Sequence, residues 1–413
     1  MAQQAFTLQT AQQFINELAD MKVQINVCDV NENSAPLRLM NKQYLPKESA
    51  SPSDVQFATL VAELVNKRLE LPVSIKLFHN DPNDTDILGL QYEARVYQFI
   101  TANIIETKIS PNFVSFVSYG CCNDNRCYLM TEKVGSGVQF GQNKLFPVKS
   151  LFNLYDLLRL HEKYQVLFQI VYSLEVMSRF KIMHNDLHDG NILVMILKDP
   201  ITLKYIVSGK TFVVQTKFIP YLFDWDTGYI EIFGDNPKLD EFFQNINASN
   251  NFDPIRDVYT LFCYLEYLKK GRSTAIGSTY AKNPTLMAKE GNRPIPIKPL
   301  VKEQIENSFQ PNRIVNGKKI YKLTSAEFES FVGKLTTFIG LGEIYFYFEN
   351  AMTIIPWNPW NCRLASKSIN FYTPEQFIEK HFNVFKTIKE VETPFVYRLP
   401  SREEINAKLR LIA

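Results

Sequence analysis

Apolar and polar positions follow two different periods in the first third of the chain. Residues 73–78 read Val-Ser-Ile-Lys-Leu-Phe between a proline and a turn-rich segment, which is typical of a β-strand. Residues 88–105 instead carry apolar side chains at the spacing of a helix. The same signals predict a helix over residues 11–21 and two more strands over residues 113–119 and 127–131.

Beyond Gly135-Ser136-Gly137, which we interpret as a hinge, apolar residues recur mostly at helical spacing. Residues 164–180 place an apolar stripe on one helix face, and residues 151–160 predict another helix before it. Pro374 marks the start of a helix near the end of the chain. Residues 201–216 are not predicted to be helical. Their pattern predicts a hairpin that turns at Ser208-Gly209.

These elements predict an α+β protein made of two unequal lobes. A small β-rich lobe spans residues 40–134, after an N-terminal extension over residues 1–39. A larger, mainly helical lobe spans residues 135–413 and contains the hairpin as an insert. The 413 residues are enough to bury a core on each side of a cleft.

The charge balance and the hydropathy exclude several classes of protein. The chain has 45 basic and 43 acidic residues, so it lacks the basic footprint of a nucleic-acid-binding protein. It has no run of 18 apolar residues, and we interpret the apolar residues 338–348 as buried core. The N-terminus also lacks the charged and apolar regions of a signal peptide. We therefore expect neither a nucleic acid nor a membrane as partner.

The cysteines are too few for a disulfide scaffold, since there are six in a chain of this length. Cys121, Cys122 and Cys127 lie close together, but they form no Cys-x-x-Cys pair and no histidine lies nearby. We therefore predict reduced thiols rather than a metal site. Reduced thiols favour a reducing compartment such as the cytoplasm.

The segment that carries chemistry runs from His184 through Asp186 to Asn191, between a predicted helix and an apolar strand. Thirty-eight residues after Asp186 comes a second acidic motif, Asp224-Trp225-Asp226. Phosphoryl transfer needs one carboxylate to orient a hydroxyl, and an amide and a second carboxylate to hold Mg²⁺. Oxygen ligands of this kind are those that Mg²⁺ prefers.

These two motifs resemble those of the protein kinase-like superfamily, and especially those of kinase-like proteins of large DNA viruses. His184-x-Asp186-x4-Asn191 is similar to the catalytic loop, and Asp224-Trp225-Asp226 is similar to the metal-binding triplet. The resemblance implies ATP and Mg²⁺ as cofactors. It also implies that Asp186 is the catalytic residue that orients the acceptor hydroxyl or accepts its proton, and that Asn191 and Asp224 are metal ligands. It also implies that His184 packs beneath the loop, and that Asp257 braces the loop from a helix.

The resemblance extends to the small lobe. Lys76 is similar to the lysine that contacts the α- and β-phosphates, and Glu93 is similar to the acid that pairs with it. Thr131 corresponds to the gatekeeper, and the backbone from Glu132 to Val134 would receive the adenine. His188 stands where protein kinases often have a lysine near the γ-phosphate, so a phosphate contact and a structural role are both open. Asp226 is either a second metal ligand or a cap, and we favour the cap.

The chain also departs from this pattern. Its first glycine is Gly89, so residues 48–55 stand where a glycine-rich phosphate loop would lie, with Val55 among the residues expected at the nucleotide. The platform for an extended peptide substrate is not recognisable after Asp226. The resemblance implies an ATP-dependent phosphotransferase acting on protein Ser or Thr hydroxyls. A small-molecule kinase and a pseudokinase that scaffolds a partner are the alternatives.

Overall fold

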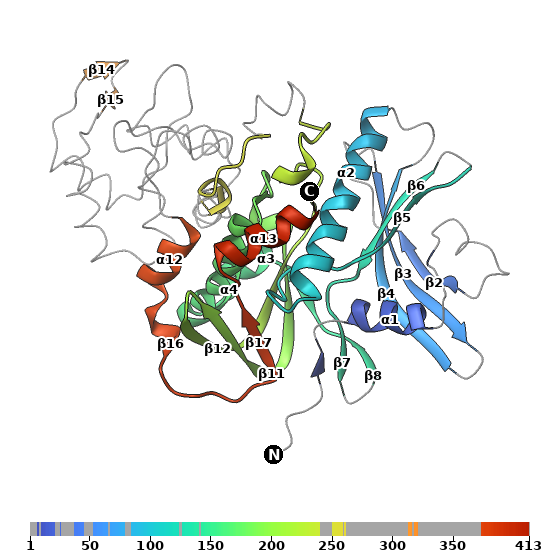
Figure 1. Ribbon diagram of the computed structural model, residues 1–413, viewed down its shortest axis with the longest axis horizontal. Coiled ribbons are helices and arrows are strands. Elements are labelled where there is room, and N and C mark those ends of the chain that lie inside the picture. The colour runs from blue at the N-terminus through green and yellow to red at the C-terminus, as the bar shows by residue number, and fades with distance from the viewer. Residues whose placement is uncertain are drawn as a thin grey trace.

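A computed structural model of the chain places two five-stranded sheets side by side, one antiparallel and one mixed, with α2 (Asp84–Ile100) between them (Figure 1). The structure describes residues 6–7, 10–20, 25, 37–44, 53–64, 67–78, 84–123, 126–139, 142–239, 250–258, 260–261, 313–315, 318–320 and 373–412. Within them the protein is mixed α and β, as the sequence predicts. Residues 338–348 lie outside the described residues.

The first sheet has five strands in the order β2-β3-β4-β6-β5. They span Leu37–Tyr44 (β2), Ser53–Leu64 (β3), Lys67–Phe78 (β4), Phe116–Cys121 (β5) and Cys127–Glu132 (β6). Alternation in β4 buries Val73 and Ile75 on the face covered by α1 (Thr10–Asp20). Lys76 therefore points from the opposite face. The predicted strands and the predicted helix over residues 11–21 are confirmed within one to three residues, apart from β4, which begins six residues earlier than predicted.

The second sheet is built on one long hairpin, β11 (Ile192–Val207) and β12 (Lys210–Leu222). The turn lies at Ser208-Gly209, where both residues have positive φ, so the predicted hairpin is confirmed but is longer than residues 201–216. Short strands extend the sheet at β9 (Val148–Ser150), β16 (Lys386–Thr387) and β17 (Phe395–Arg398).

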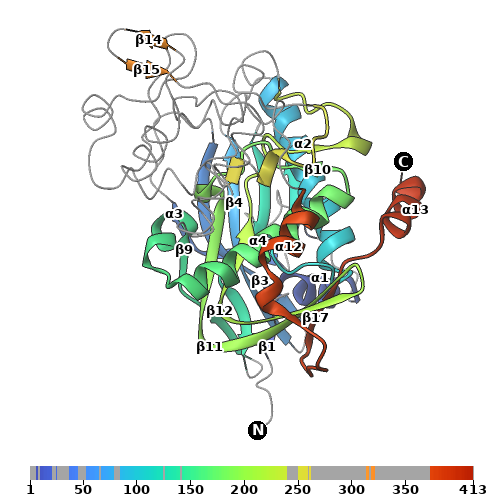
Figure 2. The same ribbon diagram turned by 90° about the vertical axis from the view of Figure 1, so that its left-hand side faces the viewer.

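An aromatic core joins this sheet to α4 (Leu160–Arg179) and α12 (Pro374–His381), which lie against each other (Figure 2). Phe168 is fully buried, and its ring contacts Tyr205 on β11 and Phe382 after α12. The predicted helix start at Pro374 is confirmed, and Thr373 accepts a hydrogen bond from the amide of Gln376.

The predicted helix over residues 151–160 is confirmed only as far as residue 157. Helix α3 (Leu151–Leu154) passes into the short 3-10 turn η3 (Tyr155–Leu157) and stops. A new helix, α4, begins at Leu160 because the Glu162 carboxylate accepts a hydrogen bond from the amide of Arg159 at 2.8 Å. The described part of residues 135–413 is also less helical than predicted, because it carries the second sheet.

The remaining elements are short. Helix α2 continues into the π-helical turn η2 (Thr101–Ile105), which completes the predicted helix over residues 88–105. The others are β1 (Phe6–Thr7), β7 (Ser136–Gln139), β8 (Gln142–Leu145), β10 (Ile182–Met183), η4 (Asp189–Asn191), β13 (Tyr229–Ile230), η5 (Glu231–Phe233), β14 (Arg313–Val315), β15 (Lys318–Ile320), η8 (Asn383–Phe385) and α13 (Arg402–Ile412). Among the described helices, none has an apolar stretch long enough to cross a bilayer.

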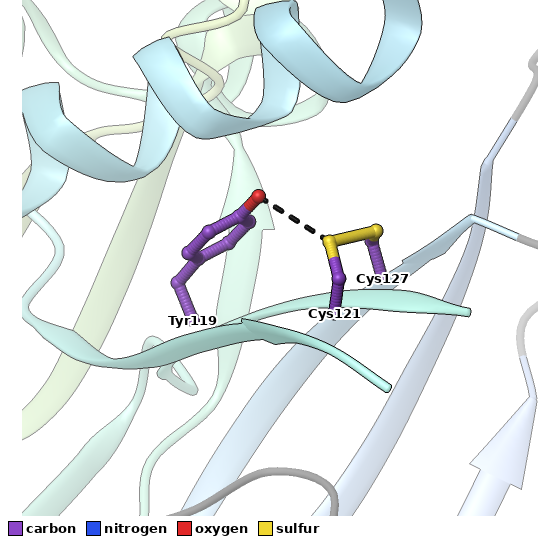
Figure 3. The surroundings of a disulfide bond; sticks show 3 residues. All are labelled: Tyr119, Cys121 and Cys127. Carbon is purple, nitrogen blue, oxygen red and sulfur yellow. Dashed lines mark hydrogen bonds between the residues drawn. A yellow bond between two sulfur atoms is a disulfide. The ribbon is translucent and has the colours of Figure 1, made fainter. Parts of the chain in front are cut away.

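The expectation of reduced thiols is wrong for Cys121 and Cys127, which form a disulfide between β5 and β6 (Figure 3). The two cysteines lie directly opposite each other in the strand register, with their Cα atoms 4.0 Å apart. The hydroxyl of Tyr119 lies 3.5 Å from the sulfur of Cys121. The cysteine content therefore gives no argument for a reducing compartment.

Candidate active site

A cavity of about 650 Å³ lies between the first sheet and the start of the second. This size is typical of a pocket for a nucleotide-sized ligand. Its lining includes six of the residues predicted for catalysis or nucleotide binding, namely Val55, Lys76, Glu93, Glu132, Val134 and Asp224. Asp186, His188 and Asn191 are not part of its lining.

Lys76 joins two carboxylates that lie far apart in the sequence. Its ammonium is 3.0 Å from Oε2 of Glu93 on α2 and 3.3 Å from Oδ1 of Asp224. Burial disfavours the charged ammonium, but attraction from Glu93, Asp224 and Asp226 outweighs it and raises the pKa of Lys76 well above its usual value. Burial raises the pKa of Glu93 to about 7, although Lys76 opposes this. The cation is therefore permanent, whereas the charge on Glu93 depends on pH near neutrality.

Asp224 has a backbone conformation that non-glycine residues seldom adopt, with φ of 66°. Its amide donates a hydrogen bond to the hydroxyl of Tyr97 at 2.9 Å. Tyr97 lies one helical turn after Glu93, so α2 fixes both Lys76 and the backbone of Asp224. A second tyrosine on α2, Tyr92, accepts from the amide of Ile230 and donates to the carbonyl of Gly234. We did not predict a role for either tyrosine, although Tyr97, four residues after Glu93, lies at helical spacing from it, which was a usable signal.

The start of the segment from His184 to Asn191 is fixed by hydrogen bonds to Asp257. Asp257, in a helical segment, accepts hydrogen bonds from the amides of His184 (2.7 Å) and Asn185 (3.0 Å). The His184 ring is fully buried, and its Nε2 lies 2.8 Å from the carbonyl oxygen of Phe223. The structural positions expected for His184 and Asp257 are thus those observed.

Asn191 lies next to Asp224 through the ladder of β11 and β12. Ile192 pairs with Leu222, and the amide of Phe223 donates to the carbonyl of Asn191 at 3.3 Å. The Asn191 side-chain amide donates to the carbonyl of Asp186, which leaves its oxygen to act as a ligand. With the Asp224 carboxylate this gives two hard oxygen ligands beside the cavity. That donor set fits Mg²⁺ held together with phosphate oxygens.

His188 packs within its own loop. Its Nδ1 accepts a hydrogen bond from the amide of Gly190 at 2.9 Å, and its Nε2 lies 3.9 Å from Oδ2 of Asp186. A Cβ atom on residue 190 would lie 2.5 Å from the imidazole ring, so glycine is required there. The imidazole therefore caps η4 and faces Asp186 rather than the cavity.

Asp226 differs from the interpretation as a cap, because its carboxylate pairs with Lys238. The two charged atoms lie 2.6 Å apart, and both residues line the cavity. Burial acts against the charged carboxylate, but Lys76 and Lys238 lower the pKa of Asp226. Lys238 was not among the predicted residues, since nothing in the sequence around it indicates a site.

At the far end of the cavity lies the connection from β6. The amides of Glu132 and Lys133 donate to the carbonyls of Ser115 (2.9 Å) and Pro72 (3.0 Å). These two donors are therefore used by the sheet and are closed to a ligand. Among the backbone hydrogen bonds of the described residues, none is donated by Val134, so its amide can serve a ligand base.

We expect the stability of the protein to fall between pH 5 and pH 8 because of Glu132. Burial raises the pKa of this carboxyl to about 8, although Ser115 and the amide of Ala11 oppose this. Between its unfolded and folded pKa values the folded state holds a proton that the unfolded state lacks. The free energy of unfolding therefore drops by up to about 1.4 kcal/mol per pH unit. Urea unfolding at pH 5.5 and 7.5 should show a smaller drop for Glu132→Gln, and equal drops would contradict this.

No family model matches the chain. The chain is similar to the uncharacterized protein 179R of Invertebrate iridescent virus 6, with 27% identity over 183 residues. The matched region covers 38% of this chain and 14% of that protein, so the chain spans only a small part of the length of its relative. This similarity suggests a viral origin for the chain.

Proposed function

We propose that the protein is an ATP- and Mg²⁺-dependent phosphotransferase with a two-lobed, protein kinase-like fold, of viral origin. The observation that supports it is the contact of Lys76 with both Glu93 and Asp224 in one cavity. This arrangement suits a triphosphate that enters with its base toward Val134. The acceptor that we favour is a protein Ser or Thr hydroxyl, with a small-molecule hydroxyl as the alternative.

Each group then has a defined part in the reaction. Lys76, oriented by Glu93, binds the inner phosphates, and Asp186 orients the acceptor hydroxyl and takes its proton. Asn191 and Asp224 hold Mg²⁺, which offsets charge on the phosphate oxygens when it is bound.

Thermal unfolding with and without nucleotide tests the proposal. We expect Mg²⁺-ATP to raise the midpoint of the wild type and to leave Asp224→Asn unchanged. Asn is the better substitution than Ala because it tolerates positive φ. A failure of the wild type to respond to ATP at any Mg²⁺ concentration would contradict the proposal.

A nucleotide-binding scaffold without turnover is the second candidate. It is favoured by the absence of glycine before Gly89, which removes a glycine-rich cover for the phosphates. Phosphate transfer to casein as a generic acceptor, or to the protein itself, separates the two. Binding without transfer favours the scaffold.

A further inference from the structure

A second lysine is built into the inner end of the cavity. Only 18% of the Lys238 side chain is exposed, and its ammonium lies 2.6 Å from Oδ2 of Asp226. Lys133 also lines the cavity, but its ammonium lies over the ring of Phe57, beside the connection from β6. Lys238 is thus the lysine that shares the end of the cavity occupied by Lys76 and the two aspartates.

The backbone of Lys238 is fixed to the same segment as Asp226. Its amide donates to Oδ1 of Asn236 at 2.9 Å. The side-chain amide of Asn236 in turn donates to the carbonyls of Asp226 (3.0 Å) and Gly228 (2.7 Å), and Asn236 is buried. The ammonium is therefore presented from a rigid turn.

The stem of Lys238 reaches the cavity across α2 at Gly89. A Cβ atom on residue 89 would lie 3.3 Å from Cδ of Lys238, which is a tight contact. Gly89 is one helical turn before Glu93 and so faces the same side of α2. Gly89, the first glycine of the chain, thus makes space for the Lys238 side chain and does not belong to a phosphate-binding loop.

Carboxylates outnumber ammonium groups near this lysine, so an anionic ligand has to enter together with a cation. Three carboxylates, Glu93, Asp224 and Asp226, meet two ammonium groups there. A triphosphate brings further negative charge, which backbone amides of a glycine-rich loop do not offset here. Lys76 comes from the first sheet and Lys238 from the segment after β13, so two separate elements each bring an ammonium group to the cavity.

We propose that Lys238 binds the terminal phosphate of the nucleoside triphosphate, with Asp226 holding its ammonium in position. This inference rests on the proposed function, because it concerns the same cavity. It assigns to a lysine outside the sequence motifs a phosphate contact of the kind considered for His188, whose ring lies 3.9 Å from Asp186 and is not part of the cavity lining. Lys238 then distinguishes a triphosphate from a diphosphate.

Calorimetric titration of the full chain with Mg²⁺-ATP and with Mg²⁺-ADP tests this. We expect Lys238→Met to weaken ATP binding about tenfold or more, since a charge-assisted hydrogen bond is lost. ADP lacks the terminal phosphate, so its affinity should change less than about twofold. Lys238→Arg keeps the positive charge and should retain most of the ATP affinity. The control is Lys210→Met, which removes a lysine paired with Glu379 on the surface of the second sheet.

Because Lys238→Met leaves Asp226 without its partner, the variant Asp226→Asn/Lys238→Met is measured beside it. Selective loss of ATP affinity in either variant supports the inference. Equal weakening of ATP and ADP, or no change in either, overturns it and leaves the proposed function standing. A wild-type protein that binds neither nucleotide overturns the proposed function itself.

Discussion

Replacing Asp186 by Asn should lower the rate of phosphoryl transfer by about three orders of magnitude and leave the affinity for Mg²⁺-ATP nearly unchanged. Asp186 is not part of the cavity lining. Its backbone carbonyl oxygen accepts the hydrogen bond from the Asn191 side chain, and the substitution does not change the backbone. The substitution therefore removes a proton acceptor and preserves the loop. Single-turnover transfer of labelled phosphate to casein, beside calorimetric ATP binding, measures both quantities.

The matched control for this variant is Asp199→Asn, the same change at an exposed position on β11. It should transfer phosphate at the wild-type rate. Full activity of Asp186→Asn would show that this carboxylate takes no part in the reaction. Loss of ATP binding together with activity would instead mean that the loop had been disrupted.

Replacing Lys76 by Met should lower kcat/KM by about two orders of magnitude, because the ammonium is a fixed donor in a partly buried site. It also leaves Glu93, which is 2% exposed, without a cation. Breaking a buried ion pair costs about 3–5 kcal/mol, and proton uptake by Glu93 lessens this cost because its pKa is already about 7.

The double variant Lys76→Met/Glu93→Gln separates stability from function. With both charges removed, we expect the free energy of unfolding to recover toward the wild-type value while transfer stays low. Urea unfolding and initial rates at pH 7.5 provide the two measurements. Recovery of transfer in the double variant would refute the role of Lys76 at the phosphates.

The pairing of Lys76 with Glu93 was predicted from the resemblance to the kinase-like superfamily, and the period of each element agrees with it. Alternation along β4 turns Lys76 away from the face of Val73, and helical spacing turns Glu93 inward. Periodicity thus gives the face on which each residue lies, whereas the contact between them came from the resemblance. The strand pattern on either side of the turn after Cys122 could likewise have placed Cys121 opposite Cys127, but we treated these cysteines only as isolated thiols.

Lys238 could not be predicted in the same way. It follows Asp226 by 12 residues in a segment without a repeating pattern, and its position depends on Asn236 and on the space above Gly89. Those are tertiary contacts that no local propensity encodes. The predicted helix over residues 151–160 ends early for a related reason, because Glu162 starts a separate helix at Leu160.

The two tyrosines of α2 also bear on how the cavity would respond to synthetic ligands. An outward displacement of α2 has to break the hydrogen bonds of Tyr92 with Ile230 and Gly234 and that of Tyr97 with Asp224 together. These hydrogen bonds therefore oppose a displacement of α2 away from the segment after β12. We expect compounds that need an outward displacement of α2 to bind weakly. Rigid compounds that fit the cavity in its present shape would lose little conformational entropy on binding.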